Sequence, residues 1–304
     1  MDYFLGIDGG GTSTRCAVGS AEAELGRAAG PTCKLARVGE EGARAALREV
    51  ISEACHAAGI SPRQIARTVV GASGAGNAAV AKRLRTIVGG IVGGEIEVAG
   101  DMVIAREAAF PGAPGVIVIA GTGSIAYGRN AKGKTARAGG WGPLLSDEGS
   151  GEWIGRAAMR AALRAFDEGD TTRLFGALWE TFQVRGRDEM VAALNAAPPP
   201  EFASLFPRVL AAADDQDVVA TRVLDSAGRE LARLAQVVLC RLWPASAPVA
   251  VAMCGGVFCI SGLVRQSFRE TLLAERPGVT VLDSPVEPVA GALSLARRAP
   301  ARVR

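Results

Sequence analysis

Short apolar runs alternate with longer amphipathic segments along the first third of this chain. Over positions 40–58 apolar residues recur at the spacing of one helix face, and Gly59 stops the pattern. Ser61-Pro62 predicts the start of a short helix, because serine is a common N-cap and proline is tolerated in a first turn. Strands separated by helices favour an α/β fold. The predicted elements are strands at 4–7, 16–18, 68–72 and 95–99 and helices at 40–58, 78–88 and 102–110.

The same alternation predicts two domains, 1–110 and 111–304, joined at a Pro-Gly-Ala-Pro-Gly hinge. The second domain begins with an apolar strand at Val116 and contains a helical insertion at about 149–241. Within and just beyond this insertion, positions 218–242 are typical of one long helix. The last helix, about 286–298, could pack back on the N-terminal domain. Each half repeats the order strand, glycine turn, strand and then helices, which indicates a duplicated architecture.

Residues 4–18, FLGIDGGGTSTRCAV, have the pattern of a buried strand, a glycine turn and a second strand. Three successive glycines let the backbone approach a ligand closely and point N–H groups at it, which is how a phosphate is held without basic side chains. Asp8 beside the turn suits a hydrated Mg²⁺, which keeps most of its waters and takes one or two carboxylates. The alternative is a tight hairpin whose tip happens to be rich in glycine.

Two further glycine turns strengthen the interpretation as a nucleotide site. Residues 116–128, VIVIAGTGSIAYG, repeat the pattern of strand, glycine turn and strand. Residues 249–258, VAVAMCGGVF, end a strand at Gly255-Gly256, shortly before the helix start expected at Ser261. A flat adenine ring could lie against such a bare backbone.

The order DGGGT, GTGS, CGG and a C-terminal PVAGALSLA helix resembles the actin–hexokinase–Hsp70 ATPase superfamily. Residues 139–155, GGWGPLLSDEGSGEWIG, are similar to the N-acetylglucosamine kinase branch, also known as the BadF/BadG/BcrA/BcrD ATPase family. The resemblance runs from Tyr3 to about Ala296. It implies an α/β protein with two ribonuclease H-like domains of the actin/hexokinase type and ligands in the cleft between them.

The resemblance also implies the cofactors, ATP and Mg²⁺, and the residues that hold them. Asp8 would hold the metal through water, Thr12 and Thr122 would contact phosphate, and Gly255-Gly256 would form the adenosine floor. The full set of expected cofactor residues is Asp8, Gly10, Gly11, Thr12, Gly121, Thr122, Gly123, Gly255 and Gly256.

Asp101 is the expected catalytic base and a substrate contact. It directly follows the predicted strand 95–99, so its carboxylate should project from the carboxyl end of a strand. The matching aspartate of the kinase family takes the proton of the acceptor hydroxyl, although its usual neighbours, Asn and Ala, are Gly100 and Met102 here. The alternative role is an N-cap for the helix expected from Met102.

Four residues of the 139–155 block are expected to contact the sugar: Gly140, Trp141, Gly142 and Asp147. Glycines leave backbone donors accessible, and a carboxylate can accept two hydroxyl groups. The alternatives are that Trp141 anchors the core and that Asp147 and Glu148 cap the helix entered at Ser150, an interpretation that is favoured for Glu148.

The turn at 30–35, GPTCKL, departs from the family, which usually has an asparagine there in contact with the sugar. Cys33 or Lys34 takes that place, depending on a one-residue gap. A lysine would attract an anionic substituent, such as the lactyl carboxylate of N-acetylmuramate, and repel the ammonium of glucosamine. The alternative is that Lys34 points to water.

Composition excludes several other classes of protein. The 34 basic and 31 acidic side chains leave a net charge of +3 without a basic cluster, which disfavours nucleic acid as a partner. No apolar run reaches the roughly 18 residues needed to span a membrane, and the N-terminus enters a strand directly, so a cytoplasmic protein is expected. The six cysteines form no CxxC pair and are expected to be buried free thiols rather than zinc or cluster ligands. The single histidine, His56, is expected at the surface, and a histidine-based catalytic triad is therefore excluded.

The sequence therefore predicts an ATP-dependent kinase that phosphorylates the 6-hydroxyl of N-acetylglucosamine or a related amino sugar. A kinase for N-acetylmuramate or glucosamine is one alternative. The other is a nucleotide-switched ATPase or activator without sugar chemistry, which would not need the block from Trp141 to Glu148. The expected partner is a small amino sugar, and a homodimer is compatible with the pattern.

Overall fold

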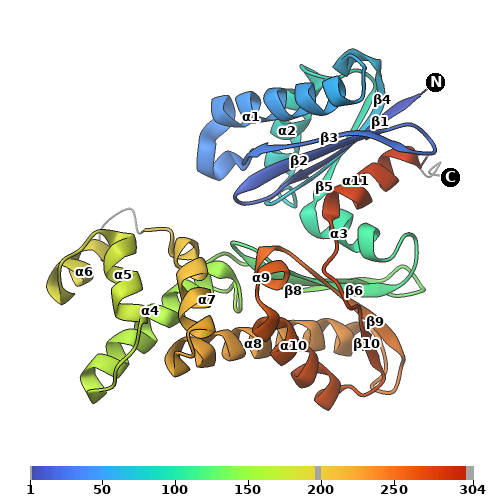
Figure 1. Ribbon diagram of the computed structural model, residues 1–304. Helices are drawn as coiled ribbons and strands as arrows, with labels where there is room; N and C mark the ends of the chain where they lie inside the picture. Colours follow the sequence, from blue (N-terminus) through green and yellow to red (C-terminus); the bar gives the residue numbers. More distant parts are fainter. Residues whose placement is uncertain (1, 196–199, 299–304) are drawn as a thin grey trace. The chain divides into compact units, whose positions relative to one another are not determined.

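The computed structural model describes residues 2–195 and 200–298, which form two compact units (Figure 1). Unit 1 comprises residues 1–117 and 286–304, and unit 2 comprises residues 118–285. The chain thus passes into unit 2 later than the expected boundary at 110/111, and its last helix belongs to unit 1.

The sheet of unit 1 has five strands in the order β3-β2-β1-β4-β5. The pairs β1–β2 and β2–β3 are antiparallel, because short turns join them, whereas β4 and β5 are reached through helices and pair in parallel. The bounds are β1 (Tyr3–Gly9), β2 (Ser13–Gly19), β3 (Glu24–Pro31), β4 (Ile65–Ala72) and β5 (Glu95–Gly100).

Alternation along the strands divides the core of unit 1 between the two faces of its sheet. Leu5 and Ile7 pack in the cluster that includes the buried face of α1, while Phe4 packs with residues of α3 and α11. Figure 1 shows α1 on one side of this sheet and α3 and α11 on the other. The helices are α1 (Leu35–Ala57), the short 3₁₀ helix η1 (Pro62–Gln64), α2 (Ala78–Gly89), α3 (Asp101–Ala109) and α11 (Pro288–Arg297).

The helix predicted at 40–58 starts earlier in the structure. α1 begins at Leu35, but Gly39 adopts a left-handed conformation (φ 68°) and separates its first residues from the regular helix that the periodicity predicts. Glycine carries no Cβ penalty in this region of backbone space. The axis of the following helix therefore does not fix the direction of the segment before Gly39.

Helix α11 lies close to both β1 and α3. A Cβ on Gly6 would overlap the backbone of Leu293, and one on Gly291 would overlap the backbone carbonyl of Ile104. Bare backbone at these crossings lets the C-terminal helix complete unit 1.

The sheet of unit 2 also has five strands, in the order β10-β9-β6-β7-β8. From β8 to β10 this is the same order as from β3 to β5 in unit 1, which confirms the predicted duplication at the level of topology. The bounds are β6 (Gly115–Ala120), β7 (Ser124–Arg129), β8 (Thr135–Gly139), β9 (Val249–Cys254) and β10 (Val279–Val281).

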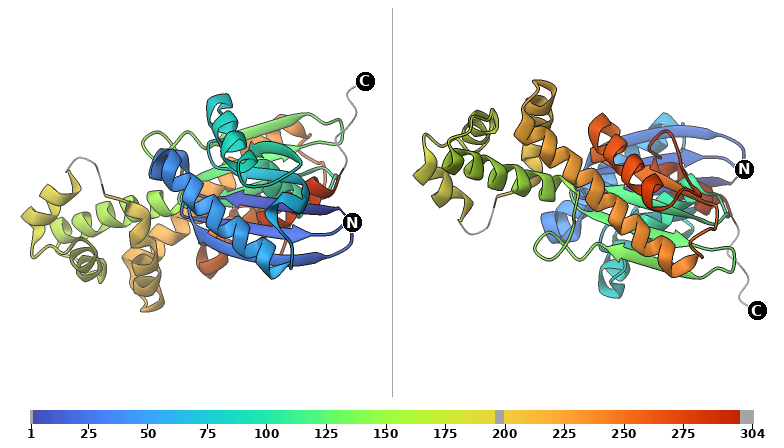
Figure 2. Two further views of the ribbon diagram at one scale, coloured as in Figure 1. Left: turned by 90° about the horizontal axis from the view of Figure 1, so that it is seen from above. Right: turned by 90° about the horizontal axis from the view of Figure 1, so that it is seen from below.

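Unit 2 carries a long helical region between β8 and β9. Helix α8 has the predicted bounds, with Asp217 as its N-cap, and it packs on β7, β8 and α10. Figure 2 shows α5 and α6 at the end of this region farthest from the sheet. The helices of unit 2 are α4 (Gly151–Glu168), α5 (Leu174–Phe182), α6 (Arg187–Leu194), η2 (Phe202–Leu205, 3₁₀), α7 (Phe206–Asp214), α8 (Val218–Leu242), α9 (Gly256–Ile260) and α10 (Gly262–Glu275).

The structure tests three of the composition-based expectations. None of the helices in the described part of the chain has the length and apolar character that crossing a membrane requires. His56 is exposed, as predicted. All six cysteines are free thiols, but Cys240 and Cys259 are exposed, so the expectation of burial was wrong for these two.

Candidate functional site

The first glycine turn joins β1 to β2 and is closed by a hydrogen bond from the amide of Gly10 to the carbonyl of Ser13 (3.0 Å). Asp8 lies at the carboxyl end of β1, and Thr12 is exposed at the tip. The turn therefore presents a carboxylate and a hydroxyl beside glycine backbone, as the sequence predicts for a phosphate and metal site.

The segment that precedes α1 is bound to this turn. The Thr32 hydroxyl donates to the carbonyl of Gly10 (2.8 Å), and the Arg37 guanidinium donates to the carbonyl of Gly11 (3.1 Å). Sequence reasoning missed both contacts, because no local pattern shows which carbonyl a distant side chain will reach.

Cys33 and Lys34 differ in burial. Cys33 is 1% exposed, and a Cβ on Gly9 would lie 2.8 Å from its sulfur, so the thiol fills the core beneath the turn. Lys34 is half-buried, and its charge lowers the pKa of Asp101. Lys34 is therefore the residue of this pair whose side chain acts on the polar site.

Asp8 and Asp101 lie at the carboxyl ends of β1 and β5, which run parallel in one sheet through β4. Burial, and then the negative charge of Asp101, raises the pKa of Asp8 to about 6, against the opposing effect of Arg15. Burial also raises the pKa of Asp101, although the Met102 amide and the charge of Lys34 oppose it. Two half-buried carboxylates that repel each other are suited to a shared cation or proton.

Helix α3 begins at Asp101, and Gly100 occupies the N-cap position. The alternative prediction, in which Asp101 is the N-cap of a helix that begins at Met102, is therefore wrong. Its carboxylate still accepts a hydrogen bond from the amide of Met102 (2.9 Å). This bond restricts the orientation of the carboxylate and leaves its second oxygen for another partner.

Helix α3 is anchored at its other end by an ion pair between a buried glutamate and a more exposed arginine, which sequence reasoning missed. Glu107 is 2% exposed and pairs with Arg298 (2.6 Å), and Gly112 of the predicted hinge donates its amide to the same carboxylate (3.4 Å). An adjacent acidic and basic residue inside an apolar helix was the available signal. The helix that carries Asp101 is thus tied both to the hinge segment and to Arg298 at the end of α11.

The second glycine turn joins β6 to β7 and is held by the start of α4. The amide of Gly151 donates to the carbonyl of Gly121 (2.8 Å), and the amide of Glu152 donates to that of Thr122 (3.3 Å). The Ser124 hydroxyl donates to the carbonyl of Glu148 (2.8 Å). The turn and the loop before α4 therefore form one hydrogen-bonded body.

Asp147 lies against this turn rather than in open solvent. It is 6% exposed, has a left-handed backbone (φ 66°), and its Oδ2 would lie 2.8 Å from a Cβ on Gly123. An aspartate tolerates this backbone conformation better than most residues. The structure thus joins the predicted sugar residue Asp147 to the predicted phosphate residue Gly123.

Trp141 is 64% exposed, and the Arg137 guanidinium lies 4.2 Å above its ring, so the core-anchor alternative is wrong. Its neighbours Gly140 and Gly142 both have a left-handed backbone (φ 72° and 95°), which projects the indole from the surface of unit 2. The capping interpretation of Glu148 is also wrong: Ser150 is the N-cap of α4, and the Glu148 carboxylate accepts from the Ser146 hydroxyl (3.0 Å).

The third glycine turn, between β9 and α9, has two different glycines. Gly255 has φ 97°, and a Cβ there would overlap the backbone of Ala120, so this glycine is required by the fold. A Cβ on Gly256 would meet nothing within 4 Å. Gly256 is therefore the open position of this turn.

The part of the chain that the structure describes contains no cluster of three or more His, Cys, Asp or Glu side chains suited to a metal. This does not conflict with Mg²⁺, which is held by one or two carboxylates and waters in many phosphate sites. The Asp8–Asp101 pair fits such an ion, because a cation would relieve the repulsion that raises the pKa of Asp8.

Fold and sequence together assign the class. Residues 5–296 match the BadF/BadG/BcrA/BcrD ATPase family, so the chain belongs to this family. A glucokinase of the ROK family from Streptomyces griseus, solved with glucose and AMPPNP, has the same fold, with a TM-score of 0.62 and 18% identity over 97% of this chain and 98% of that one.

The more similar relatives are named as amino-sugar kinases. The chain is 32% identical to the N-acetylmuramic acid/N-acetylglucosamine kinase of Clostridium acetobutylicum, over 98% of this chain and 99% of the relative. It is 30% identical to the N-acetyl-D-glucosamine kinase of Dictyostelium discoideum, over 97% and 98%. A Chromobacterium violaceum protein provisionally named an N-acetylglucosamine kinase has a TM-score of 0.78 and 28% identity, over 98% and 99%.

Proposed function

We propose that this chain is an ATP-dependent amino-sugar kinase that transfers the γ-phosphate to the 6-hydroxyl of N-acetylglucosamine or a closely related sugar. The observation that carries the proposal is the carboxylate pair Asp8–Asp101 at one edge of a sheet, beside a glycine turn. The names and near-complete coverage of the curated relatives support it.

Asp101 would act as the base that takes the proton from the acceptor hydroxyl. A carboxylate whose pKa is raised by burial is a better proton acceptor than an exposed one, and the Met102 amide keeps it oriented. Asp8 would hold Mg²⁺ through water, and this ion would neutralise charge on the phosphates. Loss of the proton from the hydroxyl and attack on the γ-phosphorus would leave ADP and the 6-phosphate of the sugar.

The glycine turns would hold the nucleotide. In unit 1, Gly10, Gly11 and Thr12 would contact phosphate, and in unit 2, Gly121, Thr122 and Gly123 would do the same. Thr12 is exposed and Thr122 is half-exposed, so both hydroxyls can reach a ligand. Gly255 and Gly256 would form the adenosine floor, with Gly256 supplying the open space.

Unit 2 would supply sugar contacts from Gly140, Trp141, Gly142 and Asp147, and unit 1 from Lys34 and Asp101. Asp147 would accept sugar hydroxyls with a carboxylate that already adjoins the phosphate turn. Mg²⁺, a cytoplasmic location and a homodimer stay predictions of this proposal.

The test is sugar-stimulated ATP turnover of the full chain, measured as ADP release with and without amino sugars. The kinase proposal predicts strong stimulation by N-acetylglucosamine. A nucleotide-switched ATPase would release ADP at the same slow rate in both conditions, and that result would overturn the proposal.

The charge of Lys34 makes a finer prediction about the substrate. If it contacts an anionic substituent, kcat/KM for N-acetylmuramate relative to N-acetylglucosamine should fall in Lys34→Asn by roughly ten- to thirtyfold, which corresponds to about 1–2 kcal/mol. Glucosamine should become a relatively better substrate. Lys132→Asn, in the exposed β7–β8 turn, is the control. An unchanged preference would leave N-acetylglucosamine as the substrate and Lys34 as a residue without a role in selectivity.

A further inference from the structure

One arginine of unit 2 is held by an aromatic ring rather than by an oxygen atom. Arg137 of β8 is half-buried, and its guanidinium lies 4.2 Å from the centre of the Trp141 ring. Among the residues that the structure describes, none forms an ion pair or a hydrogen bond with this guanidinium. The buried Arg276 of the same unit, by contrast, donates to the carbonyls of Pro244 and Ala245 (3.0 and 3.3 Å). The donors of Arg137 are therefore available to a ligand.

The contact with the ring leaves the guanidinium suited to a carboxylate. The five N–H donors of an arginine lie in the plane of the group, so a ring above one face does not occupy them. A carboxylate accepts two of these donors in the same plane. The backbone of Arg137 is also fixed, because it pairs with Tyr127 of β7 and its carbonyl accepts from the Arg241 guanidinium (2.8 Å).

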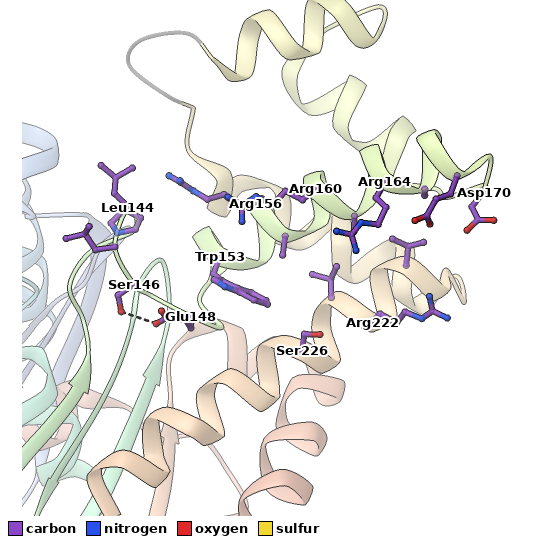
Figure 3. Close-up of a pocket in the computed structure, with 18 residues that line it drawn as sticks. Leu144, Ser146, Glu148, Trp153, Arg156, Arg160, Arg164, Asp170, Arg222 and Ser226 are labelled. Carbon is purple, nitrogen blue, oxygen red and sulfur yellow. Dashed lines mark hydrogen bonds between the residues drawn. The ribbon is translucent and has the colours of Figure 1, made fainter. Parts of the chain in front are cut away.

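The loop that carries Trp141 has hydrogen bonds of its own. The amides of Leu145 and Ser146 both donate to the carbonyl of Gly142 (3.1 and 2.9 Å). Figure 3 shows the next bond, from the Ser146 hydroxyl to the Glu148 carboxylate, beside the groove between α4 and α8. The ring that supports Arg137 is therefore part of an ordered loop.

Arg137 adjoins residues that the proposed function assigns to the sugar. A Cβ on Gly140 would lie 2.8 Å from the side chain of Ile125, and Arg137 pairs with Tyr127, two residues further along β7. Two residues of a strand span about 7 Å. Trp141, which contacts the guanidinium, directly follows Gly140. One sugar with a substituent on its ring can therefore contact both the glycine backbone and Arg137.

We propose that Arg137 is a specificity-determining residue, which binds a carboxylate carried by the substrate. This inference rests on the proposed function, because it takes Gly140, Trp141 and Asp147 as sugar contacts. The substrate class is an amino sugar with an acidic substituent, such as the lactyl ether of N-acetylmuramate. Neutral N-acetylglucosamine would occupy the same site and leave the guanidinium without an anion.

The test is calorimetric titration of the full chain with N-acetylmuramate and with its carboxamide, a neutral group of nearly the same size. Mg²⁺ and a non-hydrolysable ATP analogue are present throughout. Wild type should bind the acid more tightly than the amide by roughly tenfold to a hundredfold, because hydrogen bonds to a charged group are the stronger ones. Arg137→Gln should bring this ratio close to one, and Arg137→Lys should keep part of it. Arg222→Gln, which removes an exposed arginine from α8, is the matched control and should keep the whole ratio.

Three results would overturn the proposal. The first is equal binding of acid and amide by wild type. The second is a ratio that Arg137→Gln keeps and Lys34→Asn abolishes, which would assign the carboxylate to unit 1. The third is a KM for ATP that Arg137→Gln raises equally with both sugars, which would assign the guanidinium to a phosphate. Thermal unfolding checks that each variant is folded.

ADP release tests the proposed function separately from this inference. Wild type that binds the acid through Arg137 but releases no more ADP with sugar than without would contradict the kinase and support the carboxylate site. Wild type that phosphorylates both compounds and binds them equally would support the kinase and overturn the carboxylate site.

Discussion

The glycine turns of the two units are alike in position and differ in what holds them. In unit 1, side chains of the segment before α1 hold the turn: Thr32 and Arg37 donate to the carbonyls of Gly10 and Gly11. In unit 2, backbone amides at the start of α4 donate to the carbonyls of Gly121 and Thr122. Both arrangements bind the carbonyls of two successive residues of the turn.

This shared feature explains how a turn without basic side chains can face an anion. The peptide unit is planar and trans, so a carbonyl held on one side directs the amide of the next residue to the opposite side. In both turns the amides so directed belong to two successive residues, Gly11 and Thr12 in unit 1 and Thr122 and Gly123 in unit 2. These residues are the expected phosphate contacts.

The difference between the turns lies in their carboxylates. The unit 1 turn carries Asp8 on its own strand and has Asp101 nearby, so two charges repel. The unit 2 turn has one carboxylate beside it, that of Asp147, which comes from a loop. In the proposed function, proton and metal chemistry would therefore fall to unit 1, whereas both units would contact phosphate and sugar.

Asp101→Asn is expected to have the largest effect. The amide oxygen can still accept from the Met102 amide, but it cannot take a proton, so kcat should fall by roughly 10²–10⁴ while ATP affinity changes little. Initial rates and nucleotide titration measure the two quantities. Near-normal kcat would remove Asp101 from the mechanism and with it the assignment of proton chemistry to unit 1.

The carboxylate pair should also make the metal-free protein sensitive to pH. Because the folded protein raises the pKa of Asp8 from 3.8 to about 6, it holds this proton more tightly than the unfolded chain. The free energy of unfolding should therefore fall as pH rises from about 4 to 6, by up to about 3 kcal/mol. Asp8→Asn should reduce this slope, leaving the part that the raised pKa of Asp101 contributes, whereas Asn at the exposed Asp2 should not change it. Urea titrations at several pH values measure how the free energy of unfolding changes with pH. The same pH dependence in wild type and in Asp8→Asn would contradict the account.

Gly123→Ala and Gly121→Ala compare a packed and an open position of one turn. A Cβ on Gly123 would press on the Asp147 carboxylate at 2.8 Å, whereas one on Gly121 meets nothing within 4 Å. Gly123→Ala should therefore lose about 1–3 kcal/mol of unfolding free energy, and Gly121→Ala less than about 0.5 kcal/mol. Both should bind ATP more weakly, because the methyl group enters the proposed phosphate space. Equal stability of the two variants would show that Asp147 does not support the turn.

Thr12→Val and Thr122→Val sharpen the comparison between units. Each exchange replaces one hydroxyl by a methyl group and should weaken Mg-ATP binding by roughly five- to thirtyfold, about 1–2 kcal/mol, without unfolding the protein. Thr135→Val, at the exposed start of β8, is the control. Calorimetry that finds wild-type affinity in Thr122→Val would show that the second turn is structural.

Local patterns were sufficient for the glycine turns, the bounds of α8 and the position of Asp101 after β5. Each of these features depends on neighbours within a few residues, such as the Asp217 cap of α8. The exposed position of Trp141 was not accessible in this way, because an apolar side chain in a loop can face either the core or solvent.

Contacts between distant residues were also out of reach. The pairing of Glu107 with Arg298 and the bond from Thr32 to Gly10 arise from the way in which strands and helices pack. The choice between Cys33 and Lys34 depends in the same way on the space beneath Gly9. Sequence reasoning could name both residues but could not place them.

The most direct test of the central claim is to identify the product formed from Mg-ATP and N-acetylglucosamine. Mass spectrometry and phosphorus–proton correlation NMR of the reaction mixture would show where the phosphate resides. The account predicts N-acetylglucosamine 6-phosphate and ADP in equal amounts with wild type, and loss of both with Asp101→Asn. ADP and inorganic phosphate without any phosphorylated sugar would contradict it.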